Sequence, residues 1–238
     1  MEFFDNYVFT YDMNDDEINY KYHHSYRVME IMIDLAKKLN LSEKDIELAK
    51  VIGLLHDIGR FEQDKLFNSF VDGEFDHGDY GVKVLKENNY LKNTNIDKED
   101  YEVVYKAIEN HNKFEIEKGL TERELFFSKL IRDADKLDIL YALGNPDCLD
   151  LDQDNYEISE LIEKDFFMNK TGNHKNKKSL NDHIIIMFSF IYDINFKPTY
   201  ELIKVNKYYD KIYERINRKD IFKKYIDYVN EYLEERVK

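Results

Sequence analysis

The chain has 238 residues, of which 43% are hydrophobic and only 2 are proline, a composition that favours helices in one large domain or a domain with an extension. Its formal net charge of −14 argues against a nonspecific nucleic-acid binder, which needs a basic face. Because Cys148 is the only cysteine, an intrachain disulfide and a thiolate zinc site are both excluded.

The first residues of the chain are acidic and lack the basic-then-apolar pattern of a signal peptide. The most apolar run, Ile184–Phe188, is far shorter than the roughly 20 residues that a membrane span needs. We therefore expect a cytoplasmic protein with neither a membrane nor a nucleic-acid polymer as its partner.

Helical periodicity dominates the whole chain, and no β-type alternation persists. The expected helices cover residues 20–39, 42–58, 76–88, 98–110, 121–143, 157–168, 181–195, 199–215 and 219–236. Ser42 with Asp45, and Thr121 with Glu124, have the spacing of N-terminal caps. Gly59 is expected to end its helix in the left-handed conformation. The pattern predicts an all-α fold.

A segment rich in Gly, Pro and Asp, residues 144–155, is the best candidate for a linker. It separates a region that contains most of the histidines from a purely helical tail. We therefore expect a first domain over residues 1–145 and a C-terminal helical extension, residues 146–238, that packs on it.

The helical phase of several histidines points them at the core. His24 shares a face with Val28 and Leu35, whereas its neighbour His23 is turned by about 100° onto the flank. By the same reasoning, His77, His111 and Asp135 face inward from three further helices.

His56 and Asp57 end a helix that is apolar nearly all round, where both desolvation and the helix carbonyls disfavour a carboxylate. A single inward histidine is ordinarily a hydrogen-bonded core residue, but four of them with two aspartates are better explained by one or two divalent ions. Imidazole with carboxylate suits Fe, Mn, Zn, Ni or Co and disfavours Ca.

Three motifs, "HSYRV" from His24, "LLHDIGR" from Leu54 and "IRDADKLD" from Ile131, occur in this order along the chain. Together they resemble the signature of the HD superfamily of metal-dependent phosphohydrolases, over roughly residues 20–145. The resemblance implies a helical HD-domain bundle. It also implies a metal site made by His24, His56, Asp57 and Asp135.

Some members of the superfamily add two histidines and hold a second ion, with the His-Asp aspartate bridging the pair. "DHGDYG" and "ENHNK" supply His77 and His111 in the corresponding order, which favours a site with two ions. The alternative is that these two histidines bind the phosphate of the substrate beside a single ion. Mg is also possible as the metal.

The resemblance implies hydrolysis of a phosphomonoester or phosphodiester by a metal-activated water. The substrate would be a nucleotide or a small phosphorylated metabolite. Asp57 and Arg60 are the candidate catalytic residues, with Arg60 clamping a phosphate or lying exposed past the helix end. Lys136 contacts the substrate or, as we favour, pairs with an acid. The chain lacks the acidic pair after His-Asp that marks guanosine tetraphosphate hydrolases.

Two other functions use the same residues. The superfamily's di-iron oxygenases have a similar set of ligands, and a noncatalytic module that senses a nucleotide would retain a metal site. The complete set argues against the noncatalytic module, because a protein that has lost its activity usually loses a ligand as well. The oligomeric state is left open.

Overall fold

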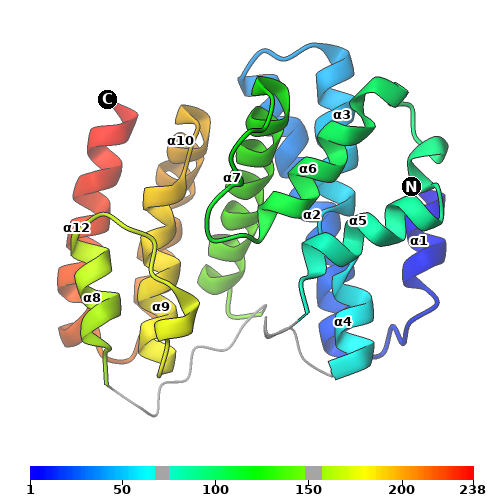
Figure 1. The fold of residues 1–238 in the computed structure, drawn as a ribbon. Helices are drawn as coiled ribbons and strands as arrows, with labels where there is room; N and C mark the ends of the chain where they lie inside the picture. Colours follow the sequence, from blue (N-terminus) through cyan, green and yellow to red (C-terminus); the bar gives the residue numbers. More distant parts are fainter. Residues whose placement is uncertain (68–74, 148–156) are drawn as a thin grey trace. The chain divides into compact units, whose positions relative to one another are not determined.

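The computed structural model describes residues 1–67, 75–147 and 157–238, and all regular structure in these ranges is helical (Figure 1). The predicted all-α fold is confirmed. The chain divides into two compact units, Met1–Ala134 and Asp135–Lys238. The predicted domains, 1–145 and 146–238, and the packing of the second on the first stay predictions.

Within the described residues, the first unit is built from six helices and the start of a seventh. They are α1 (Glu2–Val8), α2 (Asp16–Lys38), α3 (Glu43–Leu55), α4 (Arg60–Phe67), α5 (His77–Glu87), α6 (Tyr101–His111) and the first half of α7 (Glu122–Gly144), with 3-10 turns η1 (Tyr90–Asn93) and η2 (Lys98–Asp100). The second unit contains the rest of α7, α8 (Glu160–Phe167), α9 (Leu180–Ser189), α10 (Lys197–Asn206), α11 (Tyr208–Arg215) and α12 (Lys219–Val237), with η3 (His174–Asn176) and η4 (Phe190–Asp193).

The core of the first unit forms where α2 packs along α3, α5 packs on α6, and α6 also contacts α3 (Figure 1). Gly53 on α3 permits the closest approach, since a Cβ there would lie 2.8 Å from the Cα of Met29 on α2. Fully buried Val28 and Leu35 follow His24 on the same face of α2, as the periodicity predicts. This packing brings His24 of α2 to face His56, which directly follows α3.

Both predicted N-terminal caps are present. The Ser42 side chain accepts a hydrogen bond from the Asp45 N–H at 3.2 Å. The backbone N–H of Thr121 donates to Glu124 Oε2 at 2.7 Å, and the Glu124 N–H donates to Thr121 Oγ1 at 3.3 Å. These bonds satisfy N–H groups that a helix end otherwise leaves without partners.

The prediction for Gly59 is wrong, because Gly119 is the one glycine with positive φ among the described residues. The helix ends at Leu55, and a short turn over His56 to Gly59 leads directly into α4, which the periodicity did not predict. Gly59 is instead needed for close packing. A Cβ there would lie 2.2 Å from the His77 carbonyl oxygen and 2.8 Å from the Gly81 nitrogen.

The second unit has a core of aromatic and aliphatic residues around α9, where Ile184, Ile185 and Phe188 are fully buried. The helix predicted over 199–215 is broken at Lys207, whose φ of 53° ends α10 and starts α11. Residues 148–155 of the predicted linker, including Cys148, lie outside the described residues. No helix within the described ranges is long and apolar enough to cross a membrane.

Candidate metal centre

Five of the predicted site residues converge in the first unit. His24 comes from α2, and His56 and Asp57 lie in the turn that follows α3. His77 is the first residue of α5 and His111 the last residue of α6. All five are buried, the most exposed being His111 at 5%. Four separate segments thus point one polar cluster into an apolar core.

Each carboxylate oxygen of Asp57 faces a different pair of histidines. Oδ2 lies 3.4 Å from the Nε2 of His24 and 3.6 Å from that of His56, and these two nitrogens are 3.2 Å apart. We call these three atoms the Oδ2 group. Oδ1 lies 3.4 Å from the Nε2 of His77 and 3.3 Å from that of His111, with 3.1 Å between the nitrogens. These are the Oδ1 group.

The spacing within both groups suits a bound metal ion. Atoms that bind one ion at about 2.1 Å, with angles of about 90–110° at the ion, lie about 3.0–3.4 Å apart. The Oδ1 group falls within this range, and in the Oδ2 group only the 3.6 Å from Asp57 to His56 slightly exceeds it. The residues therefore fit two ions that share the carboxylate of Asp57.

The hydrogen bonds of the histidines support the same reading. His56 Nδ1 lies 2.8 Å from the Gly53 carbonyl oxygen, and His111 Nδ1 lies 2.7 Å from that of Ile108. Because a carbonyl oxygen only accepts, each Nδ1 must carry the hydrogen. In the neutral ring, the lone pair of each Nε2 then points into the cluster. Lone pairs that converge on a carboxylate repel one another unless a cation lies between them.

Two permanent cations flank Asp57. Lys21 Nζ lies 2.7 Å from Oδ2, and Arg60 Nε lies 3.7 Å from Oδ1. Burial acts to raise the pKa of Asp57, but the positive charge of Lys21 is the foremost of the causes that outweigh it and hold that pKa well below its usual range. Asp57 is therefore a carboxylate, which is the form that binds metal ions.

Arg60 is not the exposed arginine of the alternative reading. Its side chain is 13% exposed, and its Nη1 donates to Gln63 Oε1 at 2.9 Å. The sequence reasoning missed Lys21, which precedes His24 by one turn on the same side of α2. This spacing is the one signal in the sequence that points to it.

A second set of contacts fixes the histidines of α5 and α6. Asp76 precedes His77, and its Oδ1 accepts hydrogen bonds from the Gly78 N–H at 3.0 Å and from Asn112 Nδ2 at 3.0 Å. Its other oxygen pairs with Lys113, which follows Asn112. We call Asp76, Asn112 and Lys113 the latch. It ties the residue that precedes α5 to the two residues that follow α6.

Asp135 is the first residue of the second unit and lies on α7, which continues without a break from Ala134. Its role as a ligand stays a prediction. Lys136, the next residue, pairs with Asp193 at 2.8 Å within the second unit. The preferred reading of Lys136 as the partner of an acid is thus confirmed.

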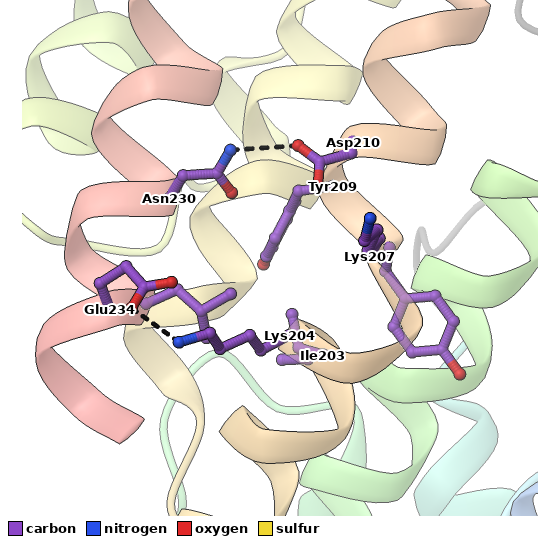
Figure 2. A pocket seen from close by; sticks show the side chains of 9 residues that line it. Ile203, Lys204, Lys207, Tyr209, Asp210, Asn230 and Glu234 are labelled. Carbon is purple, nitrogen blue, oxygen red and sulfur yellow. Dashed lines mark hydrogen bonds and ion pairs between the residues drawn. The ribbon is translucent and has the colours of Figure 1, made fainter. Parts of the chain in front are cut away.

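The second unit contains a hollow of about 280 Å³ between α10, α11 and α12 (Figure 2). Two pairs of its lining side chains are hydrogen-bonded to each other. Lys204 Nζ donates to Glu234 Oε2 at 2.6 Å, and Asn230 Nδ2 donates to Asp210 Oδ1 at 3.1 Å (Figure 2). The lining has no histidine, so the hollow does not resemble the cluster of the first unit.

The HD domain family model matches residues 22–140, which are 119 of the 238 residues of the chain. No curated protein and no solved structure gives a significant match. The match contains all three motifs and the two additional histidines. The chain therefore belongs to the HD domain family, whose members are typically metal-dependent phosphohydrolases and bind divalent metal ions.

Proposed function

We propose that this chain is a phosphohydrolase that uses two divalent metal ions to cleave a phosphate ester of a nucleotide or a small phosphorylated metabolite. The observation that carries the proposal is the geometry around Asp57. Its two oxygens face two separate histidine pairs, at distances that suit one ion each. Fe, Mn, Zn, Ni and Co suit these ligands best, and Mg is possible.

In this proposal, His24, His56, Asp57 and Asp135 would hold the first ion, and His77, His111 and Asp57 would hold the second. Asp135 is assigned from its place in the family motif. When bound, such ions lower the pKa of a coordinated water toward 7 and neutralise charge on the phosphoryl oxygens. The buried histidines exclude bulk water around Asp57, and the bonds from His56 and His111 to backbone carbonyls keep each Nε2 directed inward.

Arg60 is the candidate for binding the phosphoryl group. A guanidinium binds phosphate through two parallel hydrogen bonds. The contact with Gln63 fixes one edge of the Arg60 side chain beside Asp57, so little side-chain freedom is lost when the group binds. The positive charge of Arg60 and Lys21 next to the cluster suits an anionic substrate, and this favours a phosphohydrolase over a di-iron oxygenase.

Elemental analysis and hydrolysis assays on the full chain test the proposal. We expect about two transition-metal ions per chain, hydrolysis of p-nitrophenyl phosphate or of a nucleotide, loss of activity with EDTA, and recovery on addition of Mn²⁺. His24→Asn should lose metal and activity. His23→Asn is the matched control, because His23 lies next in sequence but is exposed.

A chain that binds no metal ion, or a His24→Asn variant as active as wild type, would contradict the proposal. One ion per chain would indicate that His77 and His111 bind phosphate and do not hold a second ion. Oxygen consumption with a mixed-valence iron signal, and no hydrolysis of any phosphate ester, would favour the oxygenase instead.

A further inference from the structure

Lys21 contacts a carboxylate oxygen that would hold a metal ion. Its ammonium group is 2.7 Å from Asp57 Oδ2, the same oxygen that faces the Nε2 atoms of His24 and His56. The Lys21 side chain is only 15% exposed, and that of Asp57 only 3%. The ammonium group therefore supplies positive charge that this buried carboxylate needs.

An ammonium group and a divalent ion cannot both stay on this oxygen without strong repulsion, because little water screens them there. A metal ion that binds the Oδ2 group would therefore favour the displacement of Lys21 from this oxygen. The flexible four-carbon stem of a lysine allows such a movement. Arg60 is different, since it lies 3.7 Å from the other oxygen and is held by Gln63.

We propose that Lys21 is an exchangeable counter-ion of the metal centre. It holds Asp57 in the metal-free chain, and when a metal ion takes its place it binds the phosphoryl group of the substrate. The inference rests on the proposed function and adds a residue to it. It assigns the substrate phosphoryl group two cationic contacts, Lys21 on the Oδ2 side and Arg60 on the Oδ1 side.

If Lys21 is exchanged in this way, removal of its ammonium group should have opposite effects on the affinities for metal and for phosphate. Removal of the ammonium removes a competitor of the metal ion, so the metal should bind more tightly. The same change removes a contact to the phosphoryl group, so phosphate should bind the metal-loaded protein more weakly. A lysine that merely stabilised the fold would not separate these two affinities.

The test uses the full-length chain after removal of metal, with Lys21→Met, Lys21→Gln and the charge-preserving Lys21→Arg. Lys38→Met is the matched control, since Lys38 is on the same helix, is 43% exposed and pairs loosely with Asp34 at 3.7 Å. Mn²⁺ is titrated into each variant by calorimetry, and inorganic phosphate is then titrated into each Mn²⁺-loaded protein.

We expect Lys21→Met and Lys21→Gln to bind the first Mn²⁺ ion about tenfold more tightly than wild type and phosphate about tenfold more weakly, each a change of about 1.4 kcal/mol. Lys21→Arg should keep phosphate affinity within about threefold of wild type. In thermal unfolding, both neutral variants should melt earlier without metal, and Mn²⁺ should restore most of the difference. Lys38→Met should match wild type in all three measurements.

The failures are distinguishable. If wild type binds Mn²⁺ and phosphate but the neutral variants bind Mn²⁺ no more tightly, the exchange is overturned and the proposed function stands. If the neutral variants stay unfolded even with Mn²⁺, Lys21 is a structural residue and the exchange is likewise overturned. If wild type binds no Mn²⁺ at all, the proposed function fails and this inference fails with it.

Discussion

Two buried aspartates, one in each unit, show how differently a protein can hold a carboxylate. Asp182 at the start of α9 is fully buried, and it accepts hydrogen bonds from the backbone N–H groups of Ser159 at 2.7 Å and Lys178 at 2.8 Å. Asp57 is 2% exposed and faces four imidazole nitrogens and one ammonium group.

The comparison separates a carboxylate with a structural role from one that we propose to be functional. Backbone N–H groups are fixed donors, so Asp182 is satisfied by the fold and ties a loop to a helix. The partners of Asp57 are side chains instead, and the Nε2 atoms of His56 and His111 direct lone pairs toward it. This arrangement is favourable only around positive charge. Burial alone does not distinguish the two residues, whereas the chemistry of their partners does.

The largest expected effect comes from Asp57. Asp57→Asn keeps the size of the side chain but removes the charge and one of the two metal-binding oxygens. We expect a fall in kcat/KM of about a thousandfold and the loss of bound metal, with the helical content retained. Steady-state kinetics and elemental analysis would check this. Asp34→Asn, on the surface of α2, is the control, and unchanged kinetics for Asp57→Asn would end the assignment.

Asp182→Ala should lower stability and leave metal binding unchanged, which is the opposite of the result expected for Asp57→Asn. It leaves the N–H groups of Ser159 and Lys178 without their acceptor in a buried site, so we expect the free energy of unfolding to fall by about 3 kcal/mol. Metal content per folded chain should stay that of wild type. Urea titration with elemental analysis measures both quantities, and a loss of metal without a loss of stability would remove the contrast with Asp57.

Gly59→Ala tests the packing that brings α5 to the metal centre. The new Cβ would lie 2.2 Å from the His77 carbonyl oxygen, so α5 has to move and His77 with it. We expect a loss of about 2 kcal/mol of stability and a fall from about two ions per chain to about one. Gly119→Ala is the control, because a Cβ there meets nothing within 4 Å, although its φ of 90° adds local strain. Two ions in Gly59→Ala would contradict this role.

The smallest expected effect is on the pH dependence of stability, and it comes from His183 in the second unit. Burial, with smaller contributions from Lys177 and His174, lowers the pKa of His183 to about 4. The folded value lies below the unfolded one, so the unfolded chain binds the additional proton and stability falls as the pH drops below 6.5. Between pH 7 and 5.5 this costs about 1 kcal/mol.

Urea unfolding of wild type and of His183→Phe across this pH range isolates the contribution of His183 to the pH dependence of stability. The variant cannot take up the proton, so its stability should depend less on pH by about 1 kcal/mol. The metal-free protein should be used, because the release of bound metal at low pH would otherwise dominate the measurement. Parallel pH profiles of the two proteins would show that His183 does not titrate as expected.

The sequence predicted the fold class and the convergence of the histidines because both depend on helical phase. His24 is buried and His23 is exposed, as a rotation of about 100° per residue requires. The prediction for Gly59 fails because it applies a local rule, that glycine ends helices in the left-handed conformation. The position is instead determined by a tertiary contact with α5. The break at Lys207 was missed because no Gly or Pro marks it. Lys21 was missed because a lysine on a helix is ordinarily solvated, and only the packing of α2 against α3 brings it to Asp57.

The latch of Asp76, Asn112 and Lys113 has a consequence for the rate at which the proposed second ion would bind. His77 and His111 come from different helices, and holding them together costs conformational entropy. The latch holds His77 and His111 together once the chain has folded. An arriving ion therefore meets a preorganised pair of ligands, and no conformational entropy is lost at the binding step. Uptake of the second ion should then be a simple bimolecular step without a slow rearrangement, and loosening Asp76 would convert it into a process limited by the motion of α5.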